Sequence, residues 1–115
     1  MSAQQNRNYL LRELAKTDRL VYTQLISELE AHPLQRGAHL NEPRLVADFI
    51  YFVDSGIVSL VATTRSGSSV EVALVGREGV AGIADALGSK PLPYGLVVQV
   101  PGLAYRVRSS IIREH

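Results

Sequence analysis

A charged loop with regularly spaced glycines is the segment of this sequence best suited to binding a ligand. It contains Gly76, Gly79 and Gly82, with Arg77 and Glu78 between the first two glycines. Glycine allows backbone N–H groups to approach an anion closely. The segment is neither a G-x-G-x-x-G motif nor a Walker loop, because it lacks the Lys-Ser/Thr end that holds phosphate and magnesium. Tight turns in a β-barrel are therefore the simpler interpretation, and ligand binding is the alternative.

No other side chains follow a catalytic or metal-binding pattern. The chain has no cysteine and only three histidines, His32, His39 and His115, which show no i, i+4 pairing with carboxylates. A Gly-x-Ser-x-Gly elbow is absent, and no histidine accompanies a nucleophile signature. We therefore expect no enzyme, no metal site and no cofactor. His32 and His39 are interpreted as ordinary surface or strand residues.

The scattered charged and aromatic residues suggest no binding surface. Adjacent strand residues face opposite ways, so Arg77 and Glu78 are expected to be solvated and unpaired with each other. Arg65, Arg106 and Arg108 are interpreted as isolated charges at strand ends. The five tyrosines are not spaced as a platform for stacking bases, and their hydroxyl groups are expected to reach water.

Length and composition indicate one globular domain. The 115 residues include 12 Lys and Arg against 11 Asp and Glu, with 46% hydrophobic residues. A net charge of +1 gives no broad field for nucleic acid, so this segment alone is not expected to bind DNA. The N-terminal residues do not form a signal peptide, and no apolar run approaches the roughly 20 residues of a membrane helix. We expect a cytoplasmic domain with no membrane contact.

Two short helices are expected at the N-terminus. Apolar residues recur at spacings of three and four over residues 10–29, which is typical of helices with one buried face. Asn6 or Asn8 can cap the first helix, and Thr17 or Asp18 can cap the second. A proline at position 33 is expected to end the helical pattern.

The rest of the chain is predicted to be mainly strands with turns between them. The strands are expected at residues 34–40, 48–53, 57–64, 70–75, 96–100 and 104–107. Turns are expected at residues 54–56, around Ser66 and Gly67, and at residues 101–102. A short helical turn is expected at residues 83–87, and a last helix opens after Ser109. This pattern predicts an α+β, mainly β, antiparallel sandwich or barrel.

The order of these elements resembles a known family. Together with YFVDSGIVSLV, VEVALVGREGVAG and VVQVPGLAYRV, it is similar to the N-terminal sensor domain of bacterial Crp/Fnr-type transcription regulators. The similarity covers residues 8–114. It implies one cyclic-nucleotide-binding-like domain over residues 1–115, with a double-stranded jelly-roll β-barrel at about residues 31–108. Helices at about residues 5–30 precede this barrel, and a truncated C-terminal helix follows it.

The resemblance also locates a degenerate ligand cassette. In nucleotide-binding members a Gly-Glu pair holds the ribose hydroxyl and an Arg-Ser or Arg-Thr pair holds the cyclic phosphate. Here Gly82 keeps the glycine, but Ile83 stands in place of the glutamate, and Pro93 and Tyr94 replace the second pair. The residues implied to line any pocket are Glu78, Gly79, Gly82, Ile83, Ala84, Pro93 and Tyr94.

Two of these replacements weigh against cyclic AMP. Arginine gives phosphate a charge-assisted bidentate contact that proline cannot make. Losing two contacts of about 1.5–3 kcal/mol each weakens binding by roughly two to four powers of ten. Cyclic AMP is therefore not the expected ligand. With Ile83 and Pro93 inside it, the pocket is expected to prefer an apolar or mixed ligand.

The function implied by the resemblance is that of a regulatory domain with an unidentified small-molecule effector. Family members continue into a dimerisation helix and a winged helix-turn-helix, neither of which occurs before His115. DNA contact is expected only through such a domain, absent here, and a homodimer is expected for a full-length protein. The alternative is a stand-alone protein-interaction module that binds no small molecule. A jelly-roll enzyme such as a cupin would need clustered metal-binding histidines, which this sequence lacks.

Overall fold

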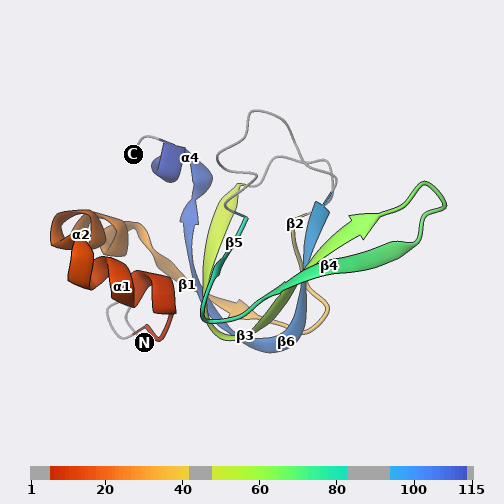
Figure 1. The fold of residues 1–115 in the computed structure, drawn as a ribbon, viewed down its shortest axis with the longest axis horizontal. Helices are drawn as coiled ribbons and strands as arrows, with labels where there is room; N and C mark the ends of the chain where they lie inside the picture. The colour runs from red at the N-terminus through yellow and green to blue at the C-terminus, as the bar shows by residue number, and fades with distance from the viewer. Residues whose placement is uncertain (1–5, 42–47, 83–93, 114–115) are drawn as a thin grey trace.

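The computed structural model describes residues 6–41, 48–82 and 94–113. Its elements are α1 (Tyr9–Thr17), α2 (Arg19–Glu28), β1 (Glu30–Leu34), β2 (His39–Asn41), β3 (Phe49–Thr63), β4 (Ser69–Val75), β5 (Val80–Ala81), β6 (Tyr94–Arg108) and α4 (Ser109–Arg113). The strands form an antiparallel sheet in the order β1-β6-β3-β4, with β2 added to β6 and β5 added to β3. The sheet curls on itself, and the helices lie at one end of it (Figure 1). This arrangement confirms the predicted mainly β, jelly-roll-like α+β fold.

The two N-terminal helices begin at the residues that the sequence favours. The side chain of Asn8 accepts a hydrogen bond from the backbone of Leu11 at the start of α1, at 3.1 Å. Asp18 does the same for Val21 at the start of α2, also at 3.1 Å. Each carboxyl or amide oxygen satisfies an N–H that has no partner within its own helix.

The strand predicted at residues 34–40 is placed differently in the structure. The chain enters β1 at Glu30, directly after α2, and Pro33 lies within this strand. β1 is at the edge of the sheet and pairs with β6 alone, so the N–H that proline lacks is not needed for hydrogen bonds to a strand on the other side. Residues 35–38 form a turn, and pairing resumes in β2.

Two predicted turns are instead bends within long strands. β3 and β6 each run for 15 residues, through the segments 54–56 and 101–102 where we expected the chain to reverse. Their pairing shifts register at these points. Gly56 has φ +91°, and a Cβ at Gly102 would collide with the carbonyl oxygen of Ser55. Glycine is therefore needed where the two bent backbones touch, and the bend folds the sheet onto itself.

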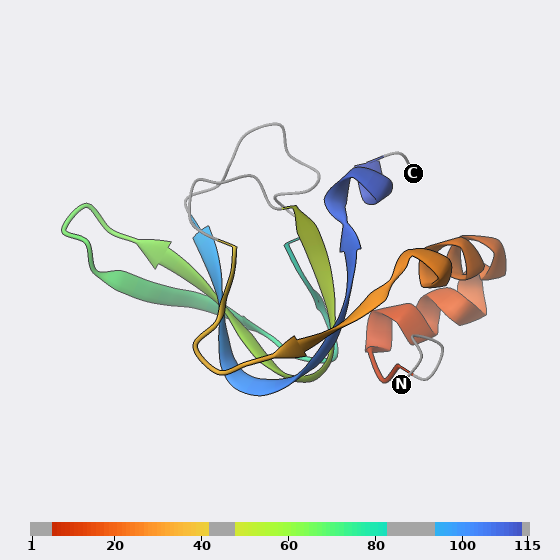
Figure 2. The same cartoon turned by 180° about the vertical axis from the view of Figure 1, so that it is seen from behind.

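The predicted Ser-Gly hairpin is present between β3 and β4. Gly67 has φ +85°, and its N–H donates to the carbonyl of Thr64 at 3.0 Å. Figure 2 shows this hairpin projecting away from the helices. Much of β4 is exposed on it, including Val70, Val72 and Leu74.

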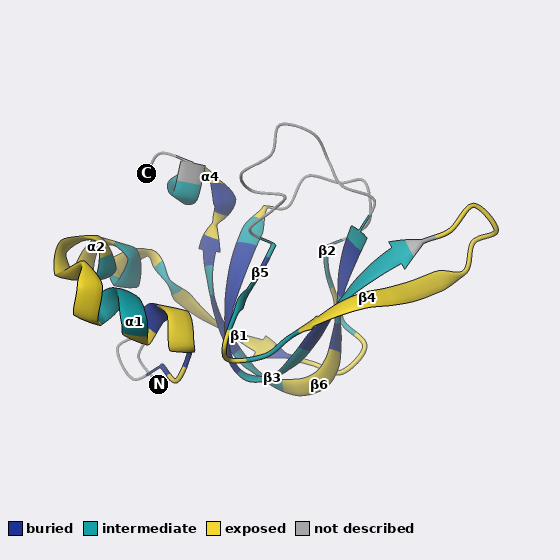
Figure 3. Cartoon of the chain, viewed as in Figure 1, coloured by how far each residue is buried: buried dark blue, intermediate teal, exposed yellow. Residues whose placement is uncertain are grey.

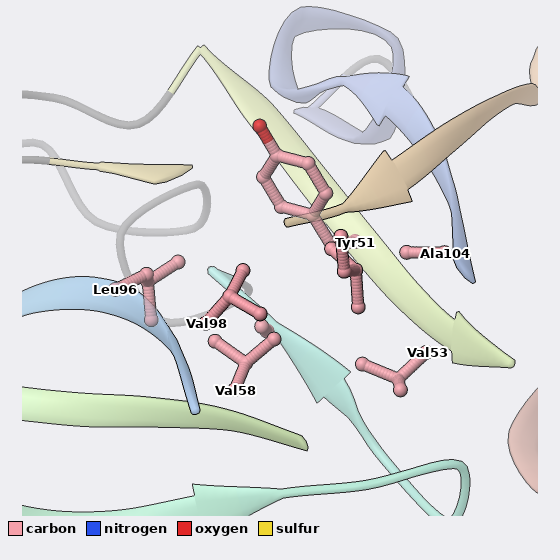
Figure 4. Packing of buried hydrophobic residues seen from close by; sticks show 8 residues of the cluster. Tyr51, Val53, Val58, Leu96, Val98 and Ala104 are labelled. Atoms are coloured by element: carbon pink, nitrogen blue, oxygen red, sulfur yellow. The ribbon is translucent and has the colours of Figure 1, made fainter. Parts of the chain in front are cut away.

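The two faces of the sheet bury two separate cores. Figure 3 shows the buried residues gathered along β3 and β6. On the inner face, the fully or almost fully buried residues include Tyr51, Val53, Val58, Leu96, Val98 and Ala104 (Figure 4). On the outer face, Ile50, Phe52 and Val107 pack with Leu11 of α1 and with residues of α2 and α4. Alternation along a strand sends neighbouring residues to opposite cores, which is why residues 50–53 are all apolar. No helix in the described part of the chain is long and apolar enough to cross a membrane.

Candidate ligand-binding site

The loop between β4 and β5 is a tight turn that uses the side chain of Glu78 to close itself. The carboxylate of Glu78 accepts a hydrogen bond from the backbone N–H of Gly76 at 3.0 Å. The N–H of Gly79 donates to the carbonyl of Gly76 at 3.1 Å. Arg77 and Glu78 are both exposed. The glycines therefore serve turn formation here, and Glu78 is occupied by its own loop.

Gly82 marks the point where the chain leaves the described sheet. It follows β5, which pairs with Tyr51 and Phe52 of β3. Its φ is +93°, and a Cβ built on it would lie 3.0 Å from the carbonyl oxygen of Phe49. Gly82 therefore lies against the first residue of β3, and a side chain there would be both strained and crowded.

The structure describes one of the four remaining residues of the predicted pocket and not the other three. Tyr94 is the first residue of β6, where it pairs in register with Ala62. Ile83, Ala84 and Pro93 lie outside the described residues. Their part in a pocket stays a prediction.

Asn8 ties the N-terminal segment to the loop before β5. Its side chain is fully buried, and its Nδ2 donates to the carbonyls of Val53 at 2.7 Å and Gly79 at 2.8 Å. Next to it, the N–H of Tyr9 donates to the carbonyl of Arg77 at 2.7 Å. From the sequence, Asn8 was expected only to cap a helix. In the structure it also anchors α1 to β3 and to the loop between β4 and β5.

A second buried polar group lies beside Asn8. Asp54 is 2% exposed and accepts hydrogen bonds from the backbone N–H and the Nε of Arg7. This pair borders an open hollow of about 470 Å³, lined also by Ile57, Leu74 and Glu78. Of the predicted pocket residues that the structure describes, Glu78 is the one that lines this hollow.

A polar cluster that the sequence analysis missed lies on the inner face, at the start of β3. The Nε of Arg106 is 2.5 Å from a carboxylate oxygen of Glu30, and its guanidinium also donates to the hydroxyl of Tyr51. Arg106 Cζ lies 4.0 Å from the ring centroid of Phe49, and Arg108 Cζ lies 5.2 Å from the same point. Interpreting Arg106 as an isolated charge was therefore wrong. Arg108 is exposed at the end of β6, as predicted, but it lies against the ring of Phe49.

Burial changes the titration of the aromatic residues in this cluster. Burial raises the pKa of Tyr51, partly opposed by its hydrogen bond from Arg106, so the hydroxyl stays neutral. The imidazole of His32 is 5.7 Å from the Tyr51 ring, centroid to centroid. Burial, followed by the positive charge of Arg106, lowers the pKa of His32. Outside the cluster, burial followed by the charge of Asp54 raises the pKa of Tyr105.

Metal binding finds no support in the part of the chain that is described. Over residues 6–41, 48–82 and 94–113, no group of three or more His, Asp or Glu side chains is close enough to hold an ion. All five tyrosine hydroxyl groups were expected to reach water, but Tyr51 and Tyr105 are only 3% and 1% exposed, so the expectation was wrong for these two.

Comparison with known proteins identifies the fold that carries this geometry. Residues 31–114 match the family described as the cyclic nucleotide-binding domain. The chain belongs to this family. Its members are regulatory binding domains and not catalytic ones. None of the curated proteins matches the sequence.

Solved structures agree with the family. A putative cAMP-binding regulatory protein from Silicibacter pomeroyi DSS-3 is 23% identical with a TM-score of 0.81, over 94% of this chain and 51% of that one. The N-terminal domain of a transcriptional regulator from Streptomyces coelicolor A3(2) is 20% identical with a TM-score of 0.73, over 88% and 70%. The c-di-GMP responsive regulator CLP of Xanthomonas campestris is 14% identical with a TM-score of 0.70, over 84% and 47%.

These likenesses show that the fold is shared with domains of regulatory proteins. The chain spans about half the length of the Silicibacter pomeroyi protein and slightly less than half the length of CLP. What those proteins bind remains a property of those proteins. The family match includes residues 78–94, where the cassette is predicted.

The residues that sequence reasoning missed have a recognisable signal. Arg106 and Arg108 are two apart on β6, so they share a face of the sheet. In register they pair with Tyr51 and Phe49, which are also two apart. This period-two pattern could have been found once β3 and β6 were correctly paired.

Proposed function

We propose that this domain is the effector domain of a Crp/Fnr-like transcription regulator whose ligand is not cyclic AMP. Proline at position 93, in the place where nucleotide-binding relatives carry arginine, is the observation that carries the proposal. Ile83 and Tyr94 remove two further polar contacts expected in such a cassette. The family match and the fold support a regulatory role.

The fold offers a physical route for a signal. Gly82, at the start of the cassette, lies against Phe49 at the start of β3. The outer face of β3 and β6 packs against Ile111 and Ile112 of α4. A ligand that favours one position of the cassette would therefore bias the packing of α4, from which the chain continues. In this proposal DNA contact and dimerisation belong to a longer protein, which acts in the cytoplasm.

Titration calorimetry tests the ligand proposal. Cyclic AMP, cyclic GMP and cyclic di-GMP are added separately to the purified domain. We expect no submicromolar binding, because the two lost contacts weaken a phosphate site by roughly two to four powers of ten. Submicromolar binding of any of the three would show that Ile83 and Pro93 have been misinterpreted.

A protein-interaction module without a small-molecule ligand is the second candidate. The observation that favours it is the exposure of large apolar side chains on α2 and β4, including Leu20 at 69% and Leu74 at 55%. Exposed apolar area of this kind is common at protein interfaces. Mass measurement by light scattering at several concentrations separates the two candidates. A stable complex between copies that no added metabolite changes would favour the module.

A further inference from the structure

The inner face of the sheet carries two arginines around one aromatic ring, close to the start of the cassette. Tyr51 pairs with Arg106, and Phe49 pairs with Arg108, so all four side chains share the inner face. Phe49 packs against the inner core, and its carbonyl lies 3.0 Å from the position of a Cβ on Gly82. The two guanidinium groups are therefore placed at the edge of the region where this family is expected to hold its ligand.

Within the described part of the chain, these guanidinium groups keep donors that have no partner. Arginine has five N–H donors. Arg106 directs Nε to Glu30 and another donor to the hydroxyl of Tyr51, which leaves three donors without a partner among residues 6–41, 48–82 and 94–113. Arg108 is exposed, and among the described residues it contacts the ring of Phe49 and pairs with no carboxylate. Two like charges held at one ring repel each other, and an anion between them would relieve that repulsion.

The space beside them has a mixed lining. A hollow of about 320 Å³ is lined by residues that include both arginines, Glu28, Glu30, Phe49 and Ile111. The two glutamates would repel a phosphate, which carries nearly two negative charges, more strongly than a carboxylate, which carries one. The carboxylate still matches the fork of N–H donors on arginine. The side chains of Phe49 and Ile111, which are only partly buried, would contact the body of such a ligand.

We propose that Arg106 and Arg108 bind the carboxylate of a small organic acid whose body is apolar. The inference rests on the proposed function, because it names the chemical class of the effector that replaces a cyclic nucleotide. The charge that a cassette arginine supplies in other members is here supplied from β6. Arg108 makes the new contact, and Arg106 adds its free donors while it stays paired with Glu30.

Isovalerate is a suitable probe, and isovaleramide is its uncharged control of the same shape. Each is titrated into the ¹⁵N-labelled domain and followed by NMR. We expect isovalerate to give saturable shifts at Phe49, Arg106 and Arg108 with a dissociation constant in the millimolar range. Isovaleramide is expected to bind at least about tenfold more weakly, and inorganic phosphate also more weakly than isovalerate. Because this comparison uses the unaltered domain, it does not depend on how any variant folds.

Two substitutions locate the site. Arg108→Gln removes the unpaired guanidinium and is expected to weaken isovalerate binding about tenfold or more. Arg65→Gln, on the exposed hairpin turn, removes the same charge elsewhere and is expected to change nothing. Equal binding of acid and amide, equal effects of the two substitutions, tighter binding of phosphate, or no saturable shift would each overturn the inference. Submicromolar cyclic AMP binding would instead overturn the proposed function, whatever isovalerate does.

Discussion

Replacing Asn8 tests how the N-terminal segment is held to the barrel. This fully buried side chain makes three hydrogen bonds at once. Its oxygen caps α1 through Leu11, and its nitrogen donates to the carbonyls of Val53 and Gly79. Asn8→Ala removes all three and leaves the buried carbonyl of Val53 and the part-buried carbonyl of Gly79 without this donor.

The magnitude follows from these contacts. Loss of a helix cap costs about 1 kcal/mol, and each lost hydrogen bond to a buried carbonyl costs about 1 kcal/mol more. We expect Asn8→Ala to lower the free energy of unfolding by about 3 kcal/mol. For a chain of 115 residues this is a fall in Tm of roughly 12 °C. Asp18→Ala is the matched control, since Asp18 caps α2 from an exposed position, and its expected cost is about 1 kcal/mol.

Asn8→Asp separates the two roles of this side chain. Aspartate caps helices as well as asparagine does, but its carboxylate cannot donate to the two carbonyls. We expect this variant to be at least as unstable as Asn8→Ala, measured by urea denaturation followed by circular dichroism. Stability close to that of the unaltered domain would refute the reasoning, because it would mean that Asn8 acts only as a cap.

Two further predictions concern the bend and the polar cluster. Gly102→Ala places a Cβ against the carbonyl of Ser55 and should lower the free energy of unfolding by about 3 kcal/mol, measured by urea denaturation. Gly37→Ala is the control, because Gly37 has φ +81° but open space around it, and its expected cost is only about 1 kcal/mol. Equal costs would contradict the close approach of the two strands at Gly102. Because the pKa of His32 is lowered in the folded state, the unfolded chain binds a proton first as the pH falls, so stability should decrease below about pH 6.5. His32→Gln should reduce that dependence, and an unchanged pH profile would show that His32 does not contribute to it.

The sequence was a good guide wherever the structure depends on local chemistry. Asn8 and Asp18 begin the helices because short polar side chains satisfy free N–H groups, and Gly67 forms the hairpin turn because it accepts positive φ. These requirements involve only a few neighbouring residues. They can be read without knowing how distant segments pair.

The errors arose where a residue's role depends on a distant partner. Gly56 and Gly102 were expected to reverse the chain, since glycine is common in turns. Instead they allow two bent strands to touch, which is a requirement set by residues almost fifty positions away. Arg106 was likewise expected to be isolated because Glu30, its partner, lies 76 positions earlier.

The candidate site could be predicted only in part. The cassette residues were predicted from a family resemblance, and the match over residues 31–114 confirms the family. The ligand chemistry of Ile83 and Pro93 stays a proposal. The second role of Asn8 could not be predicted, because a cap residue gives no sign in the sequence of what its nitrogen will contact. Its contact with Gly79 depends on how α1 docks on the barrel.

The most direct test of the central claim restores the missing cassette side chains. The double variant Ile83→Glu with Pro93→Arg returns the carboxylate and the guanidinium that nucleotide-binding relatives use. In calorimetry with cyclic AMP, we predict no submicromolar binding to the unaltered domain and a gain of roughly two powers of ten or more in the double variant. Submicromolar binding to the unaltered domain, or equal binding to both, would contradict the claim that these two positions removed cyclic-nucleotide recognition.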